Sequence, residues 1–155
     1  MIYLVFCSLP QAQIDEPLVL SHGEKYFSAS LSVVSQRTQK SGKKATQELR
    51  IAYKTRKGFE AAYTLISRPV TPADRKKIRE AETNGQVPGL GGLAHDCPWV
   101  WQVEDGLEEI QPETIQFCAL LATVALGPIV PPHLDTVLSV RTARDLAANP
   151  HHAYR

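Results

Sequence analysis

The pentapeptide His95-Asp96-Cys97-Pro98-Trp99 holds the densest group of chemically active side chains in the sequence. As metal ligands, its imidazole and thiol would need partners such as His22, His133 or Cys118, and no metal-binding spacing joins them. A Cys–His nucleophile pair requires contact in space, and the spacing favours no pairing. We interpret the segment as a loop that packs Trp99 on the core, and predict no catalytic residue, no metal and no cofactor.

Basic side chains form the second candidate. Between positions 37 and 57 the only acidic residue is Glu48, and Gly42 allows a bend in the middle. A two-stranded ribbon with this composition can enter a nucleic-acid groove or follow phosphates, and Tyr26 or Tyr53 would stack on a base if exposed. The predicted nucleic-acid-binding residues are Arg37, Lys40, Lys43, Lys44, Arg50, Lys54, Arg56 and Lys57. A lysine-rich edge hairpin that only keeps the protein in solution is the plainer interpretation.

The formal net charge of +1 conceals a segregation of charge along the chain. Residues 25–79 carry 14 of the 17 Lys and Arg residues and three acids, whereas residues 80–155 carry ten acids and three bases. This asymmetry favours a polyanionic partner for the basic part. It equally fits mutual neutralisation of the two parts, within one molecule or between copies.

Three further patterns have plain structural interpretations. The segment Gly89-Leu90-Gly91-Gly92 lacks the spacing of a phosphate-binding loop, so we expect a flexible lid or arm. The acids between positions 104 and 113 are typical of a solvated loop and a helix start. Among the basic residues of 75–79, Lys76 and Lys77 lie four and three residues before Glu80, a spacing that allows ion pairs along a helix. We therefore expect the charges of this helix surface to neutralise one another.

The elements that must position these groups follow from periodicity. Strands are expected near the N-terminus, in residues 25–36, 48–55, 59–67 and 99–104, and a short one in 17–23. Residues 37–46 are expected to be a turn-rich connection. Thr71-Pro72 predicts a surface helix to about Thr83, and Gln111-Pro112 a buried helix to about Leu126. Residues 142–148 predict a short helix capped by Thr142.

Together these patterns predict an α+β fold: an antiparallel sheet packed on one buried helix, with a projecting basic β-hairpin. We expect one domain over residues 1–155, with the hairpin at 36–57 and a Gly-rich loop at 84–98. The three cysteines share no disulfide pattern, and the apolar N-terminal stretch lacks a preceding base, so we expect a cytoplasmic protein without a membrane segment.

The leading functional hypothesis is a non-enzymatic module that contacts the phosphates of DNA or RNA through the hairpin, with weak sequence preference. The alternative is a structural or accessory subunit of a multi-protein assembly, for example viral, in which basic and acidic surfaces of neighbouring subunits pair and the chain forms a homo-oligomer. An enzyme is the third hypothesis, and it would require a pocket in which His95 or Cys97 meets a second polar group.

Overall fold

The computed structural model describes residues 1–10, 13–41 and 44–149, and only the backbone of residues 39–41 and 44–45. Six strands form one antiparallel sheet in the order β2-β3-β4-β5-β1-β6. They are β1 (Ile2–Cys7), β2 (Ala29–Ser41), β3 (Lys44–Thr55), β4 (Glu60–Pro69), β5 (Trp99–Glu104) and β6 (Ile129–Val130). The described helices are α1 (Glu16–Tyr26), α2 (Pro72–Gly85), the short 3-10 helix η1 (Gly91–Ala94), α3 (Pro112–Ala125) and α4 (Val140–Ala148). The predicted α+β class is therefore confirmed.

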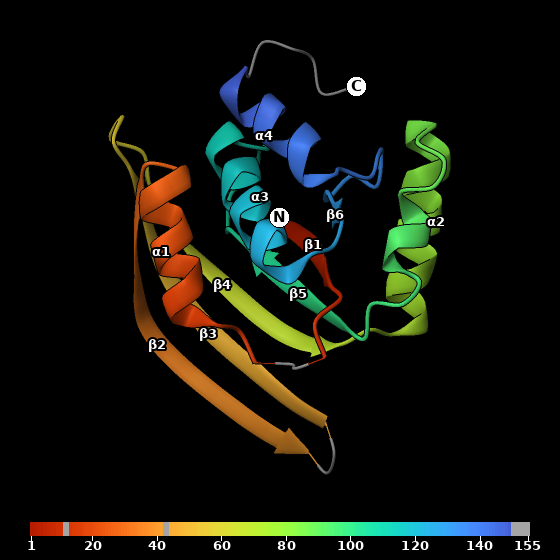
Figure 1. Cartoon of the computed structure of the whole chain (residues 1–155), viewed down its shortest axis with the longest axis horizontal. Helices are drawn as coiled ribbons and strands as arrows, with labels where there is room; N and C mark the ends of the chain where they lie inside the picture. Colours follow the sequence, from red (N-terminus) through yellow and green to blue (C-terminus); the bar gives the residue numbers. More distant parts are fainter. Residues whose placement is uncertain (11–12, 42–43, 150–155) are drawn as a thin grey trace.

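The two faces of the sheet pack differently (Figure 1). Helices α1, α3 and α4 lie on one face, and α3 is buried along nearly its whole length. Helix α2 lies on the other face, where Ile78 and Ala81 pack on Leu4, Phe6 and Val100 of β1 and β5. No described helix packs on that second face over β2, β3 and β4.

Aromatic side chains fix α3 to the middle of the sheet. Phe117 stacks on Tyr63, with ring centroids 4.3 Å apart, and meets Tyr53 edge-on at 5.4 Å. The Tyr53 hydroxyl donates to Gln116 Oε1 at 2.7 Å, and the Tyr63 hydroxyl bonds with that of Thr114 at 3.1 Å. Because both phenols find partners, their burial carries little desolvation cost.

The first helix contradicts the expected strand at residues 17–23. Asp15 caps α1 by accepting the Leu18 N–H at 3.2 Å, and Pro17 occupies the first turn. Only Val19 and Gly23 of α1 are buried. At Gly23 the helix packs closely on β2, because a Cβ there would displace the end of the Leu31 side chain. The apolar Leu18-Val19-Leu20 run thus belongs to a helix with one narrow buried stripe.

The hairpin is longer than expected. Residues 37–46 were expected to be a turn-rich connection, but β2 and β3 stay paired as far as Ser41 and Lys44. A β-bulge at Val34 shifts the register of β2 once. Deeper in the ladder, Gln47 is buried and accepts the Ile14 N–H at 2.9 Å, so the segment before α1 braces the hairpin.

The strand expected at 25–36 begins only at Ala29, because Lys25 and Tyr26 end α1, and the remaining elements follow the predictions with small shifts. Thr71 and Asp74 form a capping box at the start of α2, as the sequence indicates. The Gly-rich loop at 84–98 contains η1. Helix α4 starts two residues earlier than expected, because Ser139 rather than Thr142 caps it. The two-residue strand β6 was not expected.

Candidate nucleic-acid interface

The sheet has an uncovered surface on β2, β3 and β4, which we call the open face. The register places on this side alternate residues of the three strands, most of them exposed: Ser30, Ser32, Ser35, Arg37, Glu48, Arg50, Lys54, Glu60, Ala62 and Thr64. Its members are mainly hydroxyl-bearing and charged, as expected for the solvated side of an antiparallel sheet. Three of the eight predicted binding residues therefore share one surface.

Those three residues differ in how far they are neutralised. Lys54 Nζ lies 3.0 Å from Glu60 Oε1, and both side chains are about two-thirds exposed, so the pair adds little stability. Arg50 donates to the Thr64 hydroxyl at 3.3 Å and forms no ion pair with the described carboxylates. Arg37 lies opposite Glu48 in the ladder, and it also lacks an ion pair within the described part of the chain.

The other predicted residues lie at the two ends of the hairpin. Arg56 and Lys57 are exposed in the turn between β3 and β4, where Gly58 adopts a φ of +92°. Lys40 and Lys44 belong to the opposite end, where only their backbone is described, and Lys43 lies outside the described residues. At about 3.3 Å per residue, β3 separates these ends by roughly 35 Å. The basic residues thus form a long row rather than one compact cluster.

Two shallow depressions adjoin the Arg56 end of the open face. They have volumes of about 500 and 440 Å³ and share Ser30 and Lys54 in their linings. Ser28, which has a φ of +51°, lines the larger one together with Arg56. Each depression also contains a carboxylate, Glu24 in the larger and Glu60 in the smaller, beside hydroxyl and basic donors of the kind that suit phosphate oxygens.

Neither tyrosine provides a stacking surface on the open face. Tyr53 is 1% exposed and points to α3, so the expectation that it would stack on a base if exposed does not apply. Tyr26 is 60% exposed, but it ends α1 and lies against His22, with ring centroids 5.3 Å apart. The described side chains of the open face therefore include charged and hydroxyl groups and no aromatic ring.

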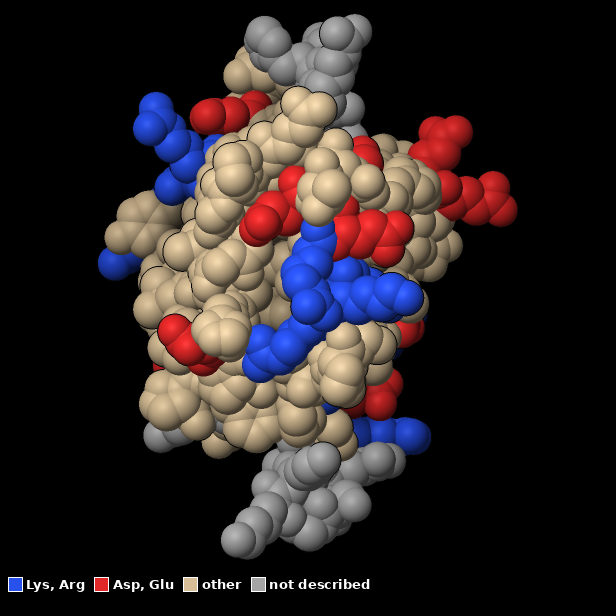
Figure 2. All heavy atoms as spheres, turned by 90° about the vertical axis from the view of Figure 1, so that its right-hand side faces the viewer, with Lys and Arg blue, Asp and Glu red and all other residues tan. Residues whose placement is uncertain are grey.

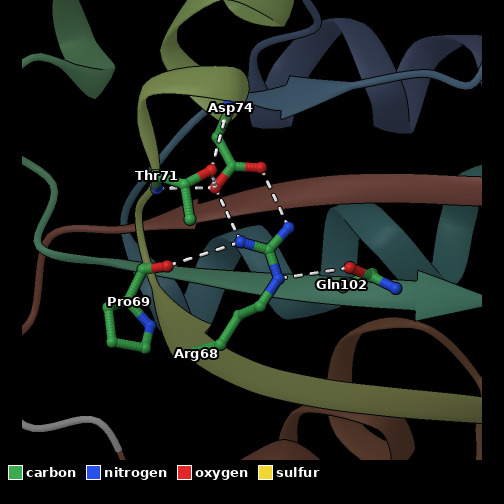
Figure 3. A network of polar contacts seen from close by, with 5 residues as sticks. All are labelled: Arg68, Pro69, Thr71, Asp74 and Gln102. Atoms are coloured by element: carbon green, nitrogen blue, oxygen red, sulfur yellow. Dashed lines mark hydrogen bonds and ion pairs between the residues drawn. The ribbon is translucent and has the colours of Figure 1, made fainter. Parts of the chain in front are cut away.

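Arg68, at the end of β4, is committed to an internal network (Figure 3). Its guanidinium donates to both carboxylate oxygens of Asp74, at 2.6 and 2.9 Å, and to Gln102 Oε1 at 3.2 Å. Burial alone would raise the pKa of Asp74, but the hydrogen bonds from Arg68 and Thr71 outweigh it and hold the pKa below its usual value. Arg68 therefore positions the start of α2 on the sheet.

The bases of α2 are not neutralised in the way that their spacing predicts. Basic side chains gather in the middle of the face that α2 presents, with acidic ones above them (Figure 2). The expected pairs of Lys76 and Lys77 with Glu80 do not form as ion pairs among the described residues. This part of the surface keeps more positive character than the sequence indicates.

The side chains of the pentapeptide at 95–99 do not gather into one site in the structure. Cys97 is buried, its thiol donates to the Leu93 carbonyl at 3.4 Å, and burial raises its pKa to about 11, so little thiolate exists at neutral pH. His95 and Asp96 are exposed. His95 lines a groove with Arg75, whose guanidinium donates to the His95 carbonyl at 3.0 Å. Trp101 is fully buried, and Trp99 packs against the same core.

The acidic residues near position 105 also differ in burial and in hydrogen bonding. Asp105 is buried and accepts hydrogen bonds from the Met1 amino group and the Leu107 N–H, both at 3.0 Å. Glu104 accepts a hydrogen bond from Gln102 at 2.8 Å. Glu108 and Glu109 are exposed. Of the described acidic residues between positions 104 and 113, these two are the exposed ones.

Within the described part of the chain, no three His, Cys, Asp or Glu side chains come close enough together to hold a metal ion. Among the described helices, none is long and apolar enough to cross a bilayer. In comparisons with known proteins, no family model, no curated protein and no solved structure matches the chain.

Proposed function

We propose that this protein binds nucleic acid through phosphate contacts along the open face and the two ends of the β2–β3 hairpin. The observation that carries the proposal is a pair of arginines on an uncovered sheet surface, Arg37 and Arg50, which have no carboxylate ion pair among the described residues. They continue the row that ends at Arg56 and Lys57. A row of about 35 Å is close to one turn of duplex DNA.

Binding in this mode is driven by the release of counterions from the phosphates. Because the described side chains of the open face include no aromatic ring, we expect a duplex backbone to bind at least as well as a single strand, with weak dependence on base sequence. If five of the basic residues contact phosphates, the logarithm of the binding constant falls with a slope of about −4.5 against the logarithm of salt concentration. Affinity then drops roughly 500-fold between 50 and 200 mM salt.

The test measures this salt slope for labelled duplex DNA, duplex RNA and single strands. Replacing Arg37 and Arg50 by Gln should reduce the slope by about 2, since two phosphate contacts are lost. The matched control replaces Lys25 and Arg141 by Gln, and these residues are exposed on helices of the opposite face. The control loses the same charge as the Arg37 and Arg50 variant, but its binding should show the same salt slope as the unmodified protein. No binding at 50 mM salt, or an equal loss in the control, would refute the proposal.

A second candidate is a subunit of a multi-protein assembly, and one observation favours it. β2 is a 13-residue strand at the edge of the sheet, and Val34 at its bulge is 64% exposed. An edge of this length can pair with another strand unless it is protected, and the bulge and the charges provide part of that protection. Sedimentation at several protein concentrations, at 50 and 500 mM salt, distinguishes self-association through charges from association through the strand edge.

A further inference from the structure

A groove of about 390 Å³ separates α2 from the 3-10 helix η1. Its lining contains two buried apolar residues, Ile78 and Ala94, which are 3% and 2% exposed. The remaining lining residues are polar or glycine: Arg75, Arg79, Glu82, Gly91, Gly92 and His95. The groove therefore combines two guanidinium groups and one carboxylate with a floor of nearly buried apolar residues.

The loop approaches α2 closely at Gly91. A Cβ at Gly91 would overlap the carboxylate of Glu82, which accepts the Gly91 N–H in a short hydrogen bond. At Gly92, by contrast, a Cβ would meet nothing within 4 Å, so the groove is open at that point. Glu82 lies three residues after Arg79, a spacing at which the two could form an ion pair on the helix. Its carboxylate is instead bonded to the Gly91 N–H.

The two arginines are held in place by backbone carbonyls and not by carboxylates. Arg75 donates one N–H to the His95 carbonyl at 3.0 Å, and Arg79 donates its Nε–H to the Arg75 carbonyl at 3.3 Å. Neither forms an ion pair within the described residues. Because they lie one helical turn apart, their like charges repel, and an anion between them would remove that cost. Figure 2 shows basic side chains gathered over this helix.

We propose that this groove is a binding site for a phosphate monoester whose organic part is apolar. A phosphate dianion pairs with the two guanidinium groups, whose planar forks match its oxygens, while the Glu82 carboxylate in the same lining stays bonded to the Gly91 N–H. The remaining donors of Arg75 and Arg79 hold the phosphate, and the organic group lies along Gly91 and Gly92, since Ile78 and Ala94 expose only 3% and 2% of their surfaces. The site uses no residue of the open face, so it does not rest on the proposed function.

The experiment follows backbone amide shifts of Gly91, Gly92 and His95 by NMR at constant ionic strength. The probes are phenyl phosphate, inorganic phosphate and benzoate. Phenyl phosphate should bind at least about fivefold more tightly than inorganic phosphate, because only its ring buries apolar surface. It should also bind about tenfold more tightly than benzoate, which brings one carboxylate charge to two arginines.

Two variants locate the site. Arg79→Gln should weaken phenyl phosphate about tenfold without loosening the loop, since Arg79 donates only within α2. The control, Lys76→Gln with Lys77→Gln, removes two charges from the same helix outside the groove and should stay within about twofold of the unmodified protein. Arg37→Gln with Arg50→Gln should leave the site unchanged. Shifts that do not saturate, or equal weakening in the lysine variant, would overturn the assignment.

Discussion

Replacing Arg68 by Met tests the network that ties α2 to the sheet. The change removes two charge-assisted hydrogen bonds from Asp74, whose side chain is 2% exposed, and leaves the carboxylate with its contacts to Thr71. Removing one partner of a fully buried ion pair costs about 3–5 kcal/mol. Because the Arg68 side chain is 22% exposed and the Thr71 contacts remain, we expect a loss of about 2–3 kcal/mol in the free energy of unfolding at pH 7.

The loss depends on pH in a defined direction. The pKa of Asp74 is below its unfolded value, so its ionised form stabilises the folded state above about pH 4, and this stabilisation is lost as pH falls through the lowered pKa. Without Arg68, burial is opposed only by Thr71, and the pKa of Asp74 is higher than in the unmodified protein. The two proteins therefore become more similar in stability below pH 4.

Urea unfolding at pH 7, 5 and 3, followed by the fluorescence of the buried Trp101, measures both effects. The matched control is Arg141→Met, which removes an exposed arginine that has no ion pair among the described residues, and which should change stability by less than about 0.5 kcal/mol. A loss at Arg68 below about 0.5 kcal/mol, or one of equal size at pH 7 and pH 3, would refute the reasoning.

Three further outcomes are expected. Gly127→Ala should lower the melting temperature by about 4–8 °C, since its Cβ would overlap the Phe6 carbonyl, whereas Gly92→Ala should change it by less than 2 °C; equal shifts would contradict this reasoning. Thr71→Ala should cost about 1 kcal/mol in urea unfolding because it removes the α2 cap, and no loss would show that the cap adds nothing. A thiol reagent at pH 7 should label the three buried cysteines at least about 100-fold more slowly than in denaturant, because burial raises the pKa of each; fast labelling of Cys97 would argue for a mobile loop.

The sequence predicts the central elements well where local signals and burial agree. The strands β1, β3, β4 and β5 and the helices α2 and α3 lie within a few residues of their expected places. At α3 the signals are a proline in the first turn and a nearly continuous apolar run. The helix ends with Leu126 in the left-handed region, at a φ of +59°, while Gly127 lies against Phe6. A glycine is needed at position 127 because the chain passes close to the Phe6 carbonyl of β1, and no local sequence pattern indicates that contact.

Helix α1 was missed although its start signals were present. Asp15, Glu16 and Pro17 are typical of a helix N-terminus, but Leu18-Val19-Leu20 suggested a strand. Gly23 packs against Leu31 of β2, and the periodicity of either segment alone does not reveal this contact. The extension of β2 and β3 through a polar segment likewise depends on cross-strand pairing and on the bond from Gln47 to Ile14.

For the candidate sites, the sequence identifies residue types and the structure assigns them to surfaces. The structure places Arg56 and Lys57 in the β3–β4 turn, at the opposite end of β3 from Lys44. It also shows that Tyr53 and Cys97 are buried. The groove at α2 was missed because Arg75 and Arg79 had been assigned to self-neutralised surface. Helix spacing permits ion pairs, but the contact of Glu82 with Gly91 depends on how the loop folds back.

The order of the strands has a consequence for how the chain is made. Among the described strands β1 pairs with β5 and β6, so its apolar segment Tyr3–Cys7 meets the first of these partners when residues 99–104 have been synthesised. At about 5–20 residues per second the ribosome takes roughly 5–20 s to reach them. β2, β3 and β4 are consecutive hairpins and can form in that interval. A newly made chain therefore passes through a period in which its most apolar strand is exposed to aggregation, and slower translation lengthens that period.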